Sequence, residues 1–239
     1  MILDACESTN ASLKKLGEDG APHGSWISAR MQTHGRGRMG RSWEAKPGNL
    51  FLSVLVRISD PIPLTWIPLQ SGISVVDAVL QNTSVSSLKI KWPNDLVVVE
   101  GGVLKKVGGI LCEGVGQKGS SFVVIGIGLN CKSHPNVDQP TTSLGIDVDQ
   151  IRPKILEAIL KPYEEGLLLP DLIRERFLKH SVLVSGAPLE WKDHMGQDHV
   201  GIFLELGPMG ELRVEMGSEI KSLYSEEIKL KPIRLNQTV

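Results

Sequence analysis

The chain is organised around the stretch Arg30-Met-Gln-Thr-His-Gly-Arg-Gly-Arg-Met-Gly-Arg-Ser-Trp43. Four arginines are interleaved with three glycines here, and no carboxylate lies among them. Arginine stays charged and forms forked contacts with carboxylates and phosphates, while glycine lets the backbone come close to a ligand. The stretch therefore predicts a cationic loop for a ligand that carries several negative charges. The alternative is an ordinary solvated loop.

Two familiar phosphate-binding motifs fit this stretch only in part. Gly35-x-Gly37-x-x-Gly40 matches the dinucleotide fingerprint, and Gly35 to Ser42 nearly matches a P-loop, with arginine in place of lysine. Each motif needs a strand before it and a helix directly after it. The stretch is followed instead by a Pro-Gly turn and a strand-like segment, 49–56. Neither motif is favoured.

The composition bounds the class of protein. The 239 residues are 41% hydrophobic and 22% charged, as in a globular protein with one large domain or a large and a small one. The net charge of -1 makes the arginine cluster a local feature, which argues against broad nucleic-acid binding. Three cysteines without a Cys-x-x-Cys spacing argue against a disulfide framework or a zinc site, so we expect a reducing cytoplasm. The sequence has no long apolar run, so we expect no membrane span.

Apolar patterns predict a mixture of strands and helices up to about residue 181. Strands are expected at 24–31, 50–56, 88–92, 97–99, 105–113 and 122–130, and helices at 66–80, 150–165 and 171–179. The segment 50–56 is apolar on both faces, so we expect it near the centre of a sheet. The arginine stretch then connects two strands of that sheet.

From about residue 182 the pattern changes to short strands and turns. These strands are expected at 182–184, 189–191, 201–206, 212–215 and 228–230. Such a series fits a small barrel. We therefore expect two domains, 1–181 and 182–239.

Polar residues at predicted element ends are candidates for ligand contacts. Ser8-Thr9-Asn10 precedes a helical pattern, so it either caps that helix or faces a small polar ligand, and the two roles are compatible. Asp95 follows Pro93 and Asn94 at a strand end, either as part of a turn or as a carboxylate that holds a cation or accepts a proton. Asn130 ends a glycine-containing strand, either as a turn residue or as a ligand contact.

Five motifs together resemble the motif series of biotin protein ligases, in that family's order and from residue 8 to about residue 230. They are Ser8-Thr9-Asn10, Gln32-Thr-His-Gly-Arg-Gly-Arg-x-Gly-Arg-x-Trp43, Lys91-Trp-Pro-Asn-Asp95, Lys106-Val-Gly-Gly-Ile-Leu-x-Glu113 and Ile125-Gly-Ile-Gly-Leu-Asn130. The resemblance implies an α+β fold: a mixed sheet flanked by helices, of the class II synthetase and biotin ligase type. A small β-barrel that resembles an SH3 domain is implied to follow it.

The resemblance also implies a two-step reaction. The biotin carboxylate attacks the α-phosphate of ATP, giving biotinyl-5′-adenylate and pyrophosphate, with Mg²⁺ accompanying the ATP. A lysine of a biotin carboxyl-carrier protein, a subunit of acetyl-CoA carboxylase, then displaces AMP. No DNA or membrane partner is expected, and a homodimer is left open. The alternatives are a lipoate-type ligase of the same fold and a non-catalytic anion- or nucleic-acid-binding module.

The site residues implied by the resemblance fall into three groups. The biotin pocket would be lined by Ser8, Thr9, Asn10, Gln32, Gly35, Arg36, Gly37, Arg38 and Lys106. The ATP site would be lined by Arg38, Arg41, Trp43, Asn94 and Asn130. The catalytic residues would be Lys106, between the biotin carboxylate and the α-phosphate, together with Arg38 and Asp95. Asp95 is expected near the metal or the incoming amine, and the other metal ligands stay open.

Two departures from the family pattern carry expectations of their own. Only seven residues precede Ser8, so we expect neither the N-terminal DNA-binding domain nor the repressor role of some family members. His34 stands where a small residue is common, without an assigned role.

Loop 35–41 is expected to be mobile without ligand, because a glycine-bearing loop that closes over a labile adenylate shields it from water.

Overall fold

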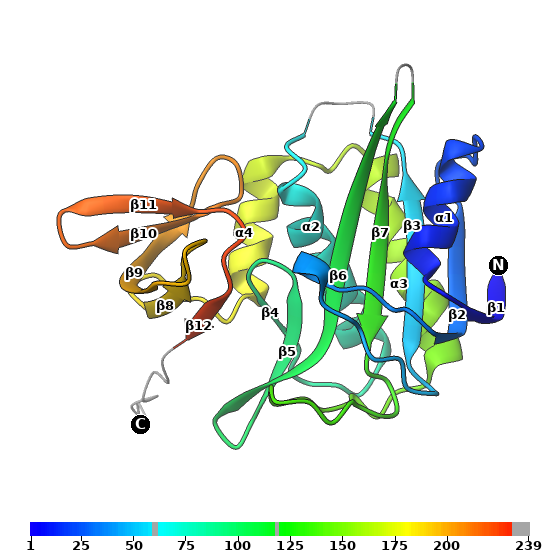
Figure 1. Cartoon of the computed structure of the whole chain (residues 1–239), viewed down its shortest axis with the longest axis horizontal. Helices are drawn as coiled ribbons and strands as arrows, with labels where there is room; N and C mark the ends of the chain where they lie inside the picture. The colour runs from blue at the N-terminus through cyan, green and yellow to red at the C-terminus, as the bar shows by residue number, and fades with distance from the viewer. Residues whose placement is uncertain (59–61, 118–119, 231–239) are drawn as a thin grey trace.

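A computed structural model describes residues 1–58, 62–117 and 120–230 of the chain (Figure 1). These residues form a seven-stranded mixed sheet with helices on both faces and a second, five-stranded antiparallel sheet. The α+β class predicted from the sequence is confirmed.

The large sheet has the strand order β1-β2-β3-β7-β6-β5-β4. Its strands are β1 (Ile2–Cys6), β2 (Trp26–Gln32), β3 (Leu50–Val56), β4 (Lys89–Lys91), β5 (Asp95–Glu100), β6 (Val103–Gln117) and β7 (Ser120–Leu129). Strand β1 runs parallel to β2, and the other neighbouring strands of the described chain pair antiparallel. The sheet is therefore mixed, as expected.

Strand β3 is buried along its whole length, as its unbroken apolar sequence predicts. Leu50, Leu52 and Val54 belong to the main core, together with residues of α2 (Trp66–Asn82) and α3 (Val148–Glu164). Leu55 packs on the opposite face, against Leu13 of α1 (Thr9–Glu18). Helices therefore cover both faces of the sheet, and the start of α1 lies over its middle strands (Figure 1).

The second sheet has the order β11-β10-β9-β8-β12. Its strands are β8 (Pro188–Lys192), β9 (Asp198–Leu206), β10 (Leu212–Met216), β11 (Glu219–Leu223) and β12 (Ile228–Leu230). It is barrel-like, as expected, but β11 and β12 stay unpaired with each other within the described chain, so it is not closed. The helix α4 (Pro170–His180) leads into it from the large sheet.

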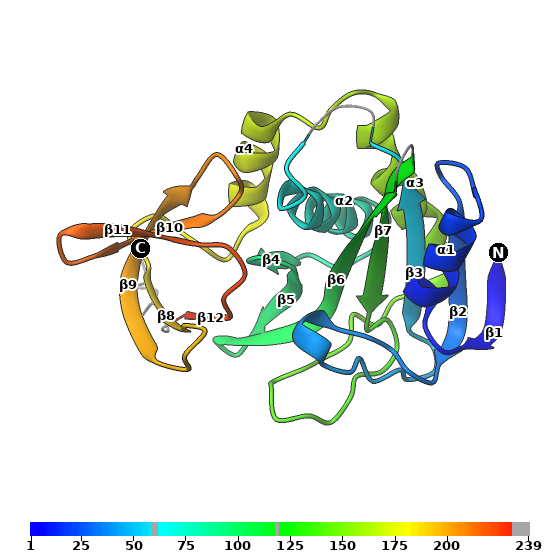
Figure 2. The same cartoon turned by 45° about the horizontal axis from the view of Figure 1, so that its top comes forward.

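Two buried tryptophans join the sheets. The Nε1 of Trp66 donates to the carbonyl oxygen of Pro208 at 3.1 Å, and the Nε1 of Trp92 donates to that of Gly210 at 3.1 Å. The core is continuous across this junction. As Figure 2 shows, the second sheet is thereby held beside the β4–β5 end of the large sheet.

The structure differs from the sequence-based prediction in three elements. Strands β1 and β11 were not predicted, because both are short and mostly exposed and so lack a clear apolar alternation. The predicted strand 182–184 is wrong: only the neighbouring Ser181 forms a single bridge, to Ile90.

No helix of the described residues is long and apolar enough to cross a membrane.

Candidate active site

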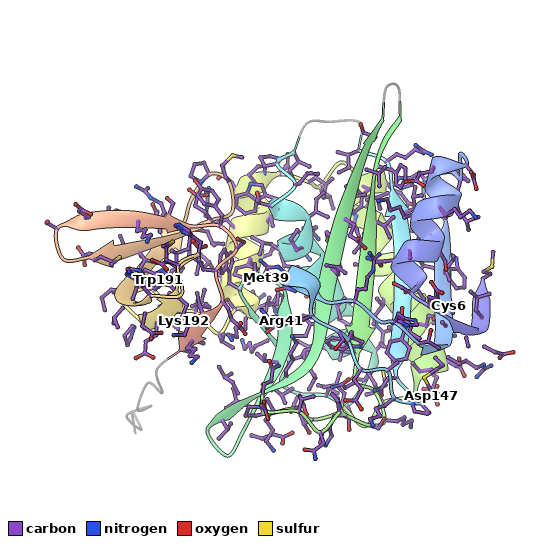
Figure 3. All side chains as sticks on the ribbon, in the orientation of Figure 1. Cys6, Met39, Arg41, Asp147, Trp191 and Lys192 are labelled. Carbon is purple, nitrogen blue, oxygen red and sulfur yellow. The ribbon has the colours of Figure 1, made fainter. Side chains whose placement is uncertain are left out.

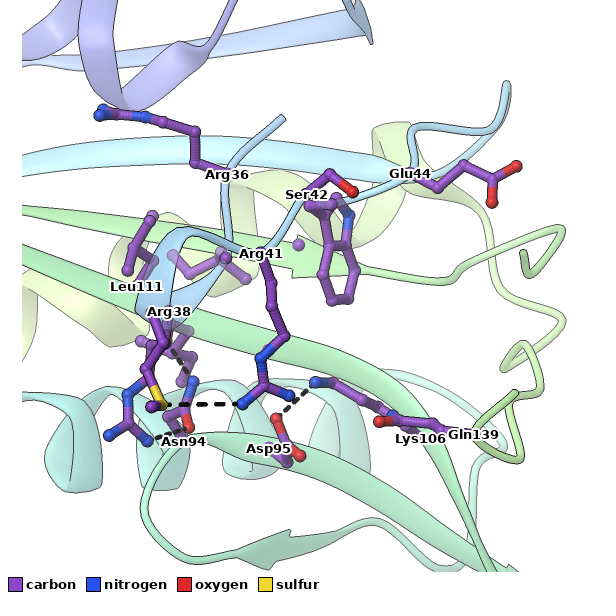
Figure 4. Close-up of a pocket in the computed structure, with 18 of the residues that line it drawn as sticks. Arg36, Arg38, Arg41, Ser42, Glu44, Asn94, Asp95, Lys106, Leu111 and Gln139 are labelled. Carbon is purple, nitrogen blue, oxygen red and sulfur yellow. Dashed lines mark hydrogen bonds and ion pairs between the residues drawn. The ribbon is translucent and has the colours of Figure 1, made fainter. Parts of the chain in front are cut away.

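A cavity of about 590 Å³ opens under the arginine loop, residues 35–43 (Figure 4). Its wall combines the start of α1, the β4–β5 turn, strands β6 and β7, the segment 135–141 and residues 225–228, which lead from β11 into β12 of the second sheet. Segments far apart in the sequence therefore meet at one place.

The structure brings nearly all of the predicted site residues to this cavity. It is lined by Ser8, Thr9, Asn10, Gln32, Arg36, Gly37, Arg38, Arg41, Trp43, Asn94, Asp95, Lys106 and Asn130. Gly35 is the exception, because it is buried behind the lining. Its carbonyl accepts from the Trp43 backbone N–H at 2.8 Å, and a side chain at this position would collide with the Trp43 carbonyl. Gly35 thus closes the base of the arginine loop.

Each of the three arginines within the loop has a partner elsewhere in the fold. Arg36 pairs with Glu113 of β6 at 3.0 Å. Arg38 donates to Asn94 Oδ1 and to the carbonyl of Ser225, both at 2.9 Å. Arg41 pairs with Glu227 at 3.0 Å. The loop is tethered to both sheets, and part of its charge is already balanced.

The arginines also point in different directions. In Figure 4, Arg41 extends toward Asp95 and Lys106, whereas Arg36 points away from them. In Figure 3, Met39 and Arg41 lie over the β4–β5 end of the large sheet. Burial lowers the pKa of Arg38, partly offset by the charge of Asp95. The loop therefore divides its charge between two ends of the cavity.

An ion pair stands at the cationic end of the cavity. Lys106 Nζ lies 2.6 Å from Asp95 Oδ1 and 5.6 Å from the centre of the Trp43 ring. Lys91 lines the same wall, and burial lowers its pKa although Asp95 and Glu227 oppose the shift. Amines and carboxylates are thus concentrated at this end of the cavity.

The opposite end is polar and almost fully buried. Ser8 caps α1, its hydroxyl accepting from the Ala11 N–H at 3.5 Å. Gln32 Oε1 accepts from the Thr9 backbone N–H at 2.8 Å, and Asn10 Nδ2 donates to Glu113 at 2.7 Å. Ser8 therefore caps the helix while Ser8, Thr9 and Asn10 line the cavity, so the two positions considered from the sequence are compatible.

Asn130 is held within the protein. Its Oδ1 accepts from Asn49 Nδ2 at 3.4 Å, and its Nδ2 donates to the Thr142 carbonyl at 3.2 Å. It joins β7 to the segments on either side of it. Asn130 therefore lines the cavity and also holds these segments together.

Several lining or supporting residues were missed by sequence reasoning. The segment 135–141 was predicted only as a loop, yet it lines the cavity and pairs with Lys106, whose backbone N–H donates to the Pro140 carbonyl at 2.9 Å. Nothing in the local sequence around Glu227 or Ser53 indicated a role at the site. Glu113 could have been found, because it ends the motif that runs from Lys106 to Glu113.

The described residues hold no group of three or more His, Cys, Asp or Glu side chains that could bind a metal ion. Mg²⁺ is commonly bound by one or two carboxylates and by the phosphates of the substrate. Asp95, at the cationic end, fits that arrangement.

Comparisons with known proteins agree with this geometry. The family model of the biotin/lipoate A/B protein ligases matches residues 3–130. The biotin–[acetyl-CoA-carboxylase] ligase of Mycobacterium tuberculosis is 35% identical over 88% of this chain and 80% of that protein. The bifunctional ligase/repressor BirA of Bacillus subtilis is 30% identical over 95% of this chain and 72% of its own.

Solved structures show the same architecture. The biotin protein ligase of Aquifex aeolicus in complex with biotin and ATP superposes with a TM-score of 0.77 at 26% identity, over 98% of both chains. The fold is that of ligases that couple an acid to a protein. The chain belongs to the biotin/lipoate A/B protein ligase family.

Proposed function

We propose that this chain is a biotin–[acetyl-CoA-carboxylase] ligase, which forms biotinyl-5′-adenylate from biotin and ATP and transfers the biotinyl group to a lysine of a carrier protein. One observation carries the proposal: a single cavity joins a buried polar end, at Thr9 and Gln32, to a cationic end, at Arg38 and Lys106. Biotin has a polar ureido ring at one end and a carboxylate at the other, which matches that division.

The polar end suits the ureido ring. Thr9, Asn10 and Gln32 offer neutral hydrogen-bonding groups there, and an uncharged ligand group needs no counter-ion. Ser8 and Gly37 are proposed to complete the biotin pocket. Gly35 supports it from behind, by closing the loop.

The cationic end suits the meeting of two anions. A carboxylate and a triphosphate repel each other, so their reaction depends on positioning and on fixed positive charge. Lys106 is proposed to exchange Asp95 for the biotin carboxylate and the α-phosphate, while Arg38 holds the phosphate from the loop. A carboxylate oxygen then attacks the α-phosphorus, and pyrophosphate leaves.

The second step breaks the mixed anhydride. The neutral lysine amine of the carrier attacks the acyl carbon, an amide bond forms, and the bond to the AMP oxygen breaks. The amine gives up a proton in this step, and Asp95 is the carboxylate proposed to lie near it. Mg²⁺, bound near Asp95 with ATP, would neutralise phosphate charge.

The nucleotide is proposed to lie against Arg41, Trp43, Asn94 and Asn130. The segment 135–141 adds a second wall on that side. Closure of the arginine loop would keep water from the adenylate.

The remaining assignments are part of the same proposal. We place the catalytic domain at 1–181 and the barrel-like domain at 182–239, and we expect a cytoplasmic enzyme without a DNA partner. The carrier protein is the proposed macromolecular substrate. A homodimer stays open.

Mass measurement of a carrier domain tests the function. The carrier domain is incubated with the chain, Mg²⁺ and ATP, together with either biotin or lipoate. We expect the carrier to gain one biotinyl group, and only with biotin. A gain only with lipoate would favour the other branch of the family. No gain with either acid would contradict the ligase assignment.

A further inference from the structure

A continuous series of hydrogen-bonding side chains runs beneath the polar end of the cavity. Thr9 Oγ1 lies 3.1 Å from Gln32 Oε1 and 2.8 Å from Ser53 Oγ. Ser53 Oγ lies 2.6 Å from Asn10 Oδ1, and Asn10 Nδ2 lies 2.7 Å from Glu113 Oε2. Ser53 is fully buried, and Thr9 and Asn10 are each 4% exposed. These groups therefore depend on one another for their partners.

The orientation of the Asn10 amide is fixed from the Glu113 side. Its Nδ2 donates to the Glu113 carboxylate and, at 3.2 Å, to the Leu111 carbonyl. A carboxylate and a carbonyl can only accept, so the amide nitrogen must face them. The carbonyl oxygen of Asn10 must then face Ser53. Gly126 makes room for this, since a side chain there would overlap the Asn10 amide.

A count of hydrogens then fixes the Thr9 hydroxyl. Three oxygen–oxygen contacts link Asn10, Ser53, Thr9 and Gln32, but only the two hydroxyls can supply a hydrogen. The contact of Ser53 with Asn10 is the shortest, and the Asn10 oxygen cannot donate, so it takes the Ser53 hydrogen. The Thr9 hydrogen points to Ser53 or to Gln32, both within the protein. Thr9 Oγ1 can therefore meet a ligand only as an acceptor.

We propose that Glu113 is a positioning residue that acts through Asn10 and Ser53 to keep Thr9 Oγ1 an acceptor for an N–H group of the ligand. The inference rests on the proposed function, in which that group belongs to the ureido ring of biotin. Without the carboxylate, the Asn10 nitrogen keeps only the Leu111 carbonyl as an acceptor, so the amide is held less firmly and turns over more easily to donate to Ser53. The Ser53 hydrogen then turns to Thr9, which leaves Gln32 Oε1, already an acceptor for the Thr9 backbone N–H, as the one acceptor in this series for the Thr9 hydrogen. That hydrogen is held less firmly within the protein and more often faces the ligand N–H, donor against donor. Ser53→Ala removes the same acceptor from Thr9 directly.

Glu113 also has a second partner, which suggests a competing role. Arg36 Nη2 lies 3.0 Å from the same oxygen, so Glu113 could act only as a tether for the arginine loop. A tether works through Arg36 and does not involve Ser53. A double-mutant cycle between Glu113 and Ser53 separates the two roles, because residues in one network are coupled and independent residues are not.

The test is calorimetry of biotin binding to the full chain. The variants are Glu113→Leu, Ser53→Ala and their combination. Each single change is expected to weaken binding about tenfold, as for one lost hydrogen bond. The double variant should lose about the same tenfold, because both changes interrupt one series. Glu113→Gln keeps a carbonyl acceptor for Asn10 and should recover most of the affinity. Glu100→Leu, which removes a carboxylate paired with Lys105, is the matched control and should bind as wild type.

Ligand discrimination gives a readout that a merely structural role would not move. Biotin is compared with two analogues, each methylated at one ureido nitrogen. Wild type should reject the analogue that lacks the N–H facing Thr9, and this preference should shrink about tenfold in Glu113→Leu and in Ser53→Ala. If a thermal melt shows that Glu113→Leu is not folded, the comparison of biotin with its methylated analogues in Ser53→Ala decides.

Three results would overturn the positioning role: wild-type affinity in Glu113→Leu, losses that add up to about a hundredfold in the double variant, or unchanged discrimination in Ser53→Ala. In each case wild type still binds biotin, so the proposed function survives. If wild type does not bind biotin at all, the proposed function fails, and this inference fails with it.

Discussion

Lys106 and Asp95 face each other across neighbouring strands, with Nζ and Oδ1 2.6 Å apart. A register shift between Leu96 and Val97 brings the start of β5 into this position, opposite Gly109 of β6. The two side chains are 21% and 20% exposed, so the pair is held by the sheet at the mouth of the cavity. An entering anion can take the place of Asp95 as the partner of Lys106.

Replacing Lys106 by alanine should slow adenylate formation by about a hundredfold or more, because fixed charge near a reacting phosphate contributes on that scale. Pyrophosphate release measures the rate, and a thermal melt checks the fold. Lys105→Ala, at the neighbouring position, is the control and should retain activity. Near wild-type release by Lys106→Ala would refute its catalytic role.

Replacing Arg36 by alanine should weaken biotin binding far more than it weakens the fold. The Arg36 side chain is 45% exposed, and exposed ion pairs contribute at most about 1 kcal/mol to stability. Calorimetry with biotin and denaturant unfolding measure the two effects. Unchanged biotin affinity would count against a place for Arg36 in the pocket.

Gly128→Ala should impair the nucleotide side of the cavity. A Cβ at Gly128 would lie 2.7 Å from the Trp43 indole, so the ring must move away from β7. We expect a higher KM for ATP with little change in biotin affinity. Steady-state kinetics with each substrate varied separately measure this, and an unchanged KM for ATP would show that Trp43 does not contact the nucleotide.

The ion pair between Arg41 and Glu227 predicts a pH-dependent contribution to stability. Burial raises the pKa of Glu227, but the hydrogen bond from Arg41 and nearby positive charge outweigh it and leave the pKa below its ordinary value of 4.5. Such a carboxylate stabilises the fold above its unfolded pKa, and its contribution is lost as the pH falls through the folded value.

Glu227→Gln should therefore melt at a slightly lower temperature than wild type near neutral pH. The difference should shrink as the pH drops below about 4.5 and vanish once the pH is below the lowered pKa of the folded protein. Thermal melts of both proteins over this range measure it. A difference that persists unchanged in acid would mean that the ion pair is not its source.

The arginine loop should be mobile without ligand and ordered with it. Its tethers to Glu113 and Glu227 involve side chains that are partly exposed, so they hold the loop only weakly. Hydrogen exchange of residues 35–41 should slow when biotin and ATP are added together. Equal exchange with and without ligands would exclude loop closure.

Much of the fold could be predicted because its signals are local. The apolar run of β3 indicates a strand buried on both faces, and the spacing of Trp66, Ile73 and Leu80 indicates α2. Strand β1 could not be predicted, because its parallel pairing with β2 depends on residues far away in the sequence. No local pattern records strand pairing either, so the sequence could not show that the second sheet stays open between β11 and β12.

The residues of the sequence motifs gather at one cavity, but their pairing could not be predicted, and part of the lining gave no signal. The motifs identified the residues that gather at the cavity, from Ser8 to Asn130. They could not show that Glu113 balances Arg36, or that Glu227 reaches Arg41 from the second sheet. Those contacts are set by the packing of distant elements, and they determine which charges remain for the substrates.

The most direct test of the central claim is a crystal structure with biotin and a non-hydrolysable ATP analogue bound together. The account predicts the ureido ring beside Thr9 and Gln32, with the biotin carboxylate and the α-phosphate both within hydrogen-bonding distance of Lys106 or Arg38. Either ligand bound outside the cavity, or the two anions held apart with no cation between them, would contradict it.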